Sequence, residues 1–162
     1  MHLKPLALSL LLATSHQASA ESFLLYSHGA WEVRYEDGEA GVRCSASVAD
    51  DGLYFSIDVL KGYGLDAWFI SSQNNFGEAV QTGQVVLQID GRQAWETPAT
   101  AQTDTVRMTG LAEGFLIDVM EGRKLFIDDD YDGQWDAWFS LNGSRAAMMA
   151  LADCNKKLGN LS

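Results

Sequence analysis

Basic residues are scarce in this chain of 162 residues. Lys and Arg together number 11, against 22 Asp and Glu, and the formal net charge at pH 7 is −11. A protein with this charge repels the phosphates of nucleic acids and the surfaces of anionic membranes. We therefore expect no nucleic-acid partner.

Histidine is also rare, with His2, His16 and His28 as its three occurrences. The first two fall in the N-terminal leader described below, so only His28 remains in the rest of the chain. This excludes a three-histidine metal site and leaves one candidate base for a Ser/His/Asp triad. No G-x-S-x-G element accompanies it. The sequence does not favour a serine hydrolase.

A long apolar run is missing as well. The longest covers residues 6–13 and has about eight residues, whereas a membrane-spanning helix needs about 20. Lys4 precedes this run and Ala18-Ser19-Ala20 follows it, which together are the parts of a secretory signal peptide. We expect residues 1–20 to be a signal peptide and residues 21–162 to form a single β-rich domain with no membrane span. The protein is then periplasmic or secreted.

Cysteine occurs twice, at Cys44 and Cys154. An exported protein enters an oxidising compartment, which favours pairing of these two thiols. The bridge closes a loop of about 110 residues, for which chain entropy predicts a stabilisation of about 4.7 kcal/mol. A reactive thiol is the less favoured alternative, because redox pairs are normally close in sequence.

Short segments rich in aromatic and β-branched residues recur between turn residues, which is typical of a mainly β domain. In the segment 53–60, the apolar residues Leu53, Phe55, Ile57 and Val59 alternate with more polar ones, so one face points to a core. Asp90-Gly91 is a hairpin signal. The strands are expected at 31–35, 41–48, 53–60, 67–71, 85–89, 93–97, 105–108, 124–127 and 135–141.

Two segments favour helices instead. Residues 114–121 carry a helical apolar stripe, although Phe-Leu-Ile-Asp-Val within them also suits a strand. Ser144 is a suitable cap for a second helix over residues 145–154. The fold class is therefore a mainly β, β-sandwich-like domain with a C-terminal helix, one additional short helix and one disulfide. Residues 55–62 and 115–122 share a similar sequence, but so short a match does not establish a duplication.

The most distinctive local motif is Asp128-Asp-Asp-Tyr-Asp-Gly-Gln-Trp-Asp136, which fits the first nine positions of a calcium-binding loop. In that template Asp128, Asp130 and Asp132 bind calcium through side chains, Gln134 through its carbonyl and Asp136 directly or through water. The twelfth position, normally Glu, is Phe139, and the flanking segments are expected strands, so the loop is not a standard EF-hand. An acidic hairpin turn on the surface is the favoured alternative. We expect no required cofactor, with Ca²⁺ as the candidate metal.

Five Trp residues are many for a domain of this size. Most are expected to pack in the core, but Trp135 and Trp138 lie beside the acidic loop and are candidates for an exposed ligand platform. The 22 acidic residues also permit a carboxylate-based hydrolase, although no pair among them stands out. We identify no catalytic residue.

An early Trp31-Glu32-Val33, a nearby Cys44 and the ending Ala-Trp-Phe-Ser-Leu-Asn-Gly-Ser-Arg-Ala-Ala-Met-Met-Ala-Leu-Ala-Asp-Cys at 137–154 form a recognisable set. It resembles the invasion-associated locus B family of small exported proteobacterial proteins, loosely over most of the chain after the leader and well over about its last 20 residues. Similar endings occur in periplasmic accessory proteins of type VI secretion.

The resemblance implies a β-sandwich-like domain without catalytic activity, with Cys44 and Cys154 as structural partners, Gly143-Ser144 as the helix entry and, in some members, a role in host-cell invasion. The chain departs from the family in having no additional cysteine pair and in carrying the acidic loop.

From these observations we expect an exported, non-enzymatic binding or envelope accessory protein. Its expected partner is an envelope or host-surface protein, or a carbohydrate. The first alternative is a calcium-dependent carbohydrate- or surface-binding module that uses residues 128–136, and the second is a small exported carboxylate-based hydrolase.

Overall fold

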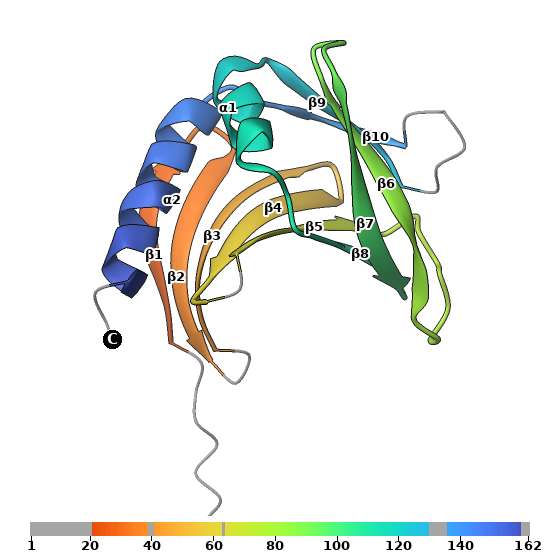
Figure 1. Ribbon diagram of the computed structural model, residues 1–162, viewed down its shortest axis with the longest axis horizontal. Coiled ribbons are helices and arrows are strands. Elements are labelled where there is room, and N and C mark those ends of the chain that lie inside the picture. Colours follow the sequence, from red (N-terminus) through yellow and green to blue (C-terminus); the bar gives the residue numbers. More distant parts are fainter. Residues whose placement is uncertain (1–20, 39–40, 63, 130–135, 160–162) are drawn as a thin grey trace, which may run out of the picture.

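The computed structural model describes residues 21–38, 41–62, 64–129 and 136–159 (Figure 1). They form ten strands and two helices, α1 (Glu113–Glu121) and α2 (Ser144–Gly159). The strands are β1 (Glu21–His28), β2 (Trp31–Gly38), β3 (Gly41–Asp50), β4 (Leu53–Leu60), β5 (Gly64–Ser71), β6 (Gln81–Ile89), β7 (Ala94–Gln102), β8 (Thr105–Thr109), β9 (Lys124–Asp128) and β10 (Ala137–Ser140).

All ten strands belong to one antiparallel sheet in the order β1-β2-β3-β4-β5-β8-β7-β6-β9-β10. The sheet curls strongly, so that its two halves face each other (Figure 1). Apolar residues at alternate positions line the concave face, because side chains in a strand point to opposite faces in turn. In β4, for example, Phe55, Ile57 and Val59 point inward and are buried.

The curl brings the last strand against the middle of the sheet. The ring of Phe139 in β10 lies 5.9 Å from that of Phe55 in β4 and 6.3 Å from that of Phe69 in β5, measured between centroids. Trp31 in β2 donates a hydrogen bond from Nε1 to the carbonyl of Ser140, at 3.3 Å. These contacts close the core, and the arrangement is β-sandwich-like although one continuous sheet supplies both layers.

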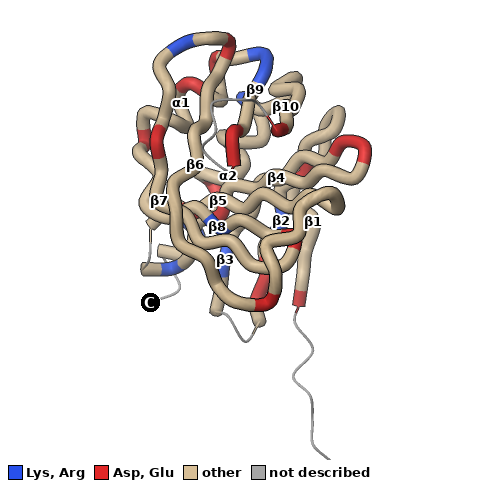
Figure 2. Tube along the Cα trace, turned by 90° about the vertical axis from the view of Figure 1, so that its right-hand side faces the viewer, with Lys and Arg blue, Asp and Glu red and all other residues tan. Residues whose placement is uncertain are grey.

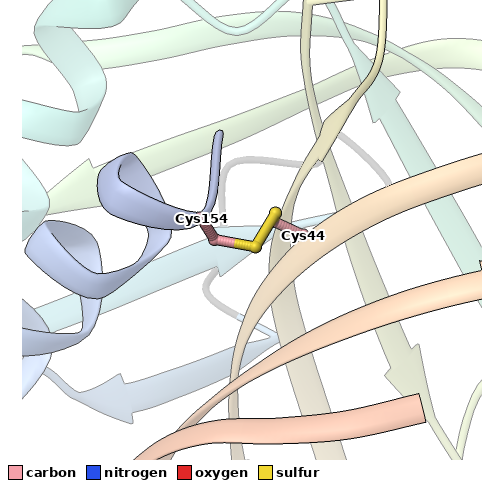
Figure 3. The surroundings of a disulfide bond; sticks show 2 residues. All are labelled: Cys44 and Cys154. Carbon is pink, nitrogen blue, oxygen red and sulfur yellow. A yellow bond between two sulfur atoms is a disulfide. The ribbon is translucent and has the colours of Figure 1, made fainter. Parts of the chain in front are cut away.

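Helix α2 packs against β1, β2 and β3, and α1 lies beside it (Figure 1). The predicted disulfide is confirmed: Cys154 in α2 is bonded to the inward-facing Cys44 in β3 (Figure 3). The hydroxyl of Ser144 donates a 2.6 Å hydrogen bond to the carbonyl of Val119 in α1, which ties the start of α2 to its neighbour. One end of the concave face is thereby covered by both helices.

The sequence located most elements correctly. Residues 53–60 match β4, and both helices are present, α2 extending to Gly159. Asp90 and Gly91 form the expected hairpin turn with φ of 50° and 70°. The prediction missed β1 entirely, because its apolar residues Phe23, Leu24 and Leu25 are consecutive and do not alternate.

The two similar segments adopt different structures. Residues 55–62 begin in β4, whereas residues 115–122 begin in α1. Ile57 is fully buried, but the matching Ile117 is 57% exposed. The similarity therefore does not reflect a repeated structural unit.

Acidic positions are spread along the trace rather than gathered in one patch, with few basic positions between them (Figure 2). No helix within the described residues is long and apolar enough to cross a membrane.

Candidate functional site

The concave face changes character along β6. Val85, Leu87 and Ile89 point inward and are buried, but the next inward position towards the start of the strand is Gly83. In the register of the sheet, Gly83 lies opposite Ala99 of β7, and Gln81 lies opposite Ala101. Large apolar side chains thus give way to small ones on the same face.

A cavity of about 590 Å³ opens where the large side chains stop. A Cβ atom placed on Gly83 would meet no heavy atom of the described residues within 4 Å, so the described part of the chain leaves the space above this residue empty. We call this cavity the concave groove. Its lining residues are Phe76, Gln81, Thr82, Gly83, Gln84, Ala99, Ala101, Val106 and Asp129.

The loop before β6 supplies one wall of the concave groove. The backbone N–H of Phe76 donates to the carbonyl of Thr103 at 2.7 Å, and Thr103 N–H donates to the carbonyl of Gly77 at 2.8 Å. Gln81 Nε2 also donates to the carbonyl of Phe76 at 2.5 Å. These bonds hold the half-buried Phe76 ring beside the small residues of the floor.

Asp129 lies on the rim of the concave groove. Its carboxylate accepts a hydrogen bond from the Asn74 side chain, and its backbone N–H donates to Oδ2 of Asp136 at 2.7 Å. Asp129 follows β9, and Asn74 belongs to the loop between β5 and β6. The rim therefore joins two loops that are more than fifty residues apart in the sequence.

The predicted calcium loop begins at the same rim. Asp128 is buried at the end of β9, and Asp136 N–H donates to the carbonyl of Ile127 at 2.8 Å, so the described ends of this segment adjoin the paired strands β9 and β10. Both interpretations of the motif place it between two strands. Asp130, Asp132 and Gln134 lie outside the described residues. Among the residues that are described, no group of three or more His, Cys, Asp or Glu side chains could hold a metal ion. Calcium binding stays a prediction.

The structure does not bring the predicted tryptophan platform to the concave groove. Trp138 alternates with the buried Ala137 and Phe139, so it points to the convex face, where it is 48% exposed. The ammonium group of Lys124 lies 4.5 Å from its ring centroid, which makes a cation–π contact on one face of the indole. Trp135 lies outside the described residues.

Sequence reasoning missed one pair of carboxylates. Asp58 in β4 and Asp66 in β5 lie directly opposite each other on the convex face, and both are buried. Arg43 NH1 lies 3.2 Å from Asp58, and Arg107 NH2 lies 2.6 Å from Asp66. Arg107 also stacks over Trp68, with its guanidinium carbon 5.2 Å from the ring centroid.

This pair has the electrostatics of a buried ion-pair network. Burial raises the pKa of Asp58 above its ordinary value of 3.8, and the positive charge of Arg43 limits the rise. Glycosidases use a carboxyl with a raised pKa beside a second carboxyl. Here both carboxyls are covered by protein and bonded to arginine, so neither is presented to a substrate. The alternation of β4 placed Asp58 on the outer face, but only the strand order reveals its partner.

The sequence of β6 contains a pattern that indicates the concave groove. Reading alternate residues of β6 backwards gives Ile89, Leu87, Val85, Gly83 and Gln81, a change from large apolar to small and then polar. The same change marks the point at which the core ends. Comparison of the chain with protein-family models, with curated proteins and with solved structures found no match in any of the three.

Proposed function

We propose that this chain is an exported, non-enzymatic binding protein of the cell envelope and that the concave groove holds its ligand. The observation that carries the proposal is the abrupt loss of side-chain volume at Gly83, Ala99 and Ala101 on a face that is otherwise filled. A cavity bounded by rigid strands, with a few polar groups converging on it, is the usual form of a ligand site.

The lining of the concave groove favours a neutral, hydroxyl-rich ligand such as an oligosaccharide. Gln81 brings an amide whose nitrogen is held by the Phe76 carbonyl and whose oxygen is an acceptor, and Phe76 adds an apolar surface. The described lining residues include no lysine or arginine, and the net charge of the chain is −11, so an anionic ligand would find no counter-charge among them. A glycan of the envelope or of a host surface meets these conditions.

Two further observations support the location and the non-enzymatic character. The Cys44–Cys154 bond suits an oxidising compartment, and it joins the two cysteines that the resemblance to the invasion-associated locus B family assigns as partners. The buried carboxylates Asp58 and Asp66 are on the opposite face of the sheet from the concave groove. The resemblance thus supports an envelope accessory or host-interaction role for a protein that binds rather than cleaves.

The test is binding of neutral cell-wall and capsular oligosaccharides, measured by calorimetry with wild type and with Ala99→Leu. The leucine occupies the concave groove, so we expect its affinity for a bound glycan to fall at least tenfold. Ala49→Leu is the matched control, because Ala49 is exposed near the end of β3, in the other half of the sheet.

Equal affinity of wild type and Ala99→Leu would show that the ligand binds elsewhere. Failure of every glycan in the panel would exclude carbohydrate as the ligand class. Release of new reducing ends from any of them, with a bell-shaped pH profile, would replace the binding protein by the carboxylate hydrolase.

A further inference from the structure

On one side of the first strand, the described residues supply no pairing strand. β1 stands at the end of the strand order and pairs with β2 alone among the described strands. Its central residues Phe23, Leu24 and Leu25 are 52%, 51% and 46% exposed. Exposed edge strands are normally protected by a lysine, a proline or a short length. β1 has eight residues and neither of those residue types.

The order of residue types in β1 is nearly the same when the strand is read from either end. Glu21-Ser-Phe-Leu-Leu-Tyr-Ser-His28 has two leucines at its centre, then an aromatic residue on each side, then a serine, and an acid and a histidine at the ends. If two copies align antiparallel about this centre, Ser22 faces Ser27, Phe23 faces Tyr26 and Glu21 faces His28 of the other copy. The strand is therefore complementary to itself, including at its ends, where a carboxylate faces an imidazole that can donate a hydrogen bond to it.

An irregularity in β1 makes this alignment sterically consistent. Opposed residues in an antiparallel pair point to the same face, but residues 23 and 26 of a regular strand point to opposite faces. In β1 the register shifts between Leu24 and Tyr26, so Phe23 lies opposite Tyr35 of β2 and Tyr26 lies opposite Val33. Tyr35 and Val33 share a face, which places Phe23 and Tyr26 on that same face.

The same shift also matches the serines. Ser22 lies opposite Glu36 and Ser27 opposite Glu32, and these two positions of β2 are both on the convex face. A bulge of this kind is usually a specific feature of a fold rather than a defect. In a regular strand of eight residues, this symmetric alignment would place facing residues on opposite faces of the sheet. The register shift in β1 removes this conflict for the outer pairs, so that the residues of each pair lie on the same face.

We propose that β1 pairs antiparallel with β1 of a second copy of this chain, which makes the sheet continuous across a symmetric dimer. An interface of this kind uses the same surface on both subunits. Two copies with a net charge of −11 each would otherwise repel, yet residues 22–27 carry no charge, and the end residues Glu21 and His28 meet with complementary chemistry. A cavity of about 310 Å³ lies beside this interface, lined by Phe23, Leu25, Tyr35 and, from α2, Cys154 and Lys157.

The first test is the mass of the exported protein by sedimentation equilibrium over a range of concentrations, for wild type and for Leu24→Lys. We expect a dimer for wild type and a monomer for the variant, because the two lysines would lie beside each other at the centre of the interface. Ile117→Lys is the matched control, since Ile117 is a comparably exposed apolar residue on α1, and it should remain dimeric.

The second test checks the register. A mixture of Ser22→Cys and Ser27→Cys proteins should form a cross-linked heterodimer on mild oxidation, whereas either variant alone should not cross-link. Cross-linking of Ser22→Cys with itself would overturn the alignment. A wild-type protein that stays monomeric at every concentration would overturn the dimer, including the case in which the edge instead receives a strand from a different protein.

Discussion

The two ends of the concave face are built from the same strands but are filled differently. At the end near the helices, Leu87 and Ile89 of β6 are fully buried beneath neighbouring elements. At the other end, Gly83 of the same strand faces an open cavity. The comparison shows that burial of a face depends on what covers it, and that residues only four positions apart on one strand can lie in a filled core and beside an open cavity.

The largest effect is expected from removing the bond that holds α2 on the filled end. The double variant Cys44→Ala/Cys154→Ala opens a link across a sequence separation of 110 residues, and we expect its free energy of unfolding to fall by about 4.7 kcal/mol. Urea denaturation measures this change. A loss below about 2 kcal/mol would mean that packing, and not the covalent link, secures the helix.

The next largest loss of stability is expected from creating a cavity in the filled end. Leu87→Ala removes a fully buried side chain from β6, and we expect a loss of about 3 kcal/mol in unfolding free energy because the surrounding core closes only partly. Thermal and urea denaturation provide the measurement. A near-neutral result would contradict the distinction between the two ends.

The matched change at the open end should leave stability almost unaltered. Gly83→Val places a β-branched side chain in empty space on the same face of the same strand, so we expect stability within about 0.5 kcal/mol of wild type, since valine suits a strand better than glycine. Glycan affinity should nevertheless fall at least tenfold. Loss of stability without loss of binding would reverse the roles assigned to the two ends.

A smaller, pH-dependent effect on stability is expected at Asp58, on the convex face of β4. Burial raises the pKa of its carboxyl in the folded state, so the folded state holds this proton more tightly than the unfolded state. The contribution of Asp58 to stability therefore falls as pH rises from the ordinary value of 3.8 through the raised value, and is level above it. Asp58→Asn lacks this fall, so its stability relative to wild type should improve as pH rises across that window.

Urea denaturation of both proteins at a series of pH values measures the difference. The raised pKa of Asp58 already includes the attraction of Arg43, so any other effect of the asparagine on stability is an offset that does not change with pH across this window. A difference that changes in the opposite direction would show that Arg43, rather than burial, governs this carboxyl.

The smallest effect concerns calcium at the rim of the open end. We expect glycan affinity to be the same in EDTA and in millimolar calcium, because the described lining contributes the Gln81 amide and a carboxylate already bonded to Asn74. Thermal denaturation with magnesium as a control tests the metal independently. A saturable rise in melting temperature specific to calcium, abolished by Asp130→Ala/Asp132→Ala, would favour the calcium-dependent module instead.

Most of the strands could be predicted because a half-buried strand shows its inward face as a period of two. Residues 53–60 display this period clearly, and β4 has the predicted bounds. The candidate site was harder to predict, since the cavity arises from missing side-chain volume on two paired strands, β6 and β7, at once. Asp129 and Asn74 meet on its rim through the curl of the sheet, which no local pattern encodes.

The sequence by itself determined the mainly β class, the Asp90-Gly91 turn, the two helices and the pairing of its two cysteines, because each follows from local periodicity, turn chemistry or the count of thiols. Only the tertiary structure decided the rest. Phe-Ser-Ile-Asp-Val at 55–59 is a strand and Phe-Leu-Ile-Asp-Val at 115–119 is a helix, although they differ at one position. In β4, pairing with β3 and β5 on both sides leaves all residues from Phe55 to Val59 buried, whereas α1 has packing on one side and buries only Phe115 and Val119, one turn apart. The neighbouring elements against which each segment packs, more than the intrinsic preference of its residues, decide between a strand and a helix.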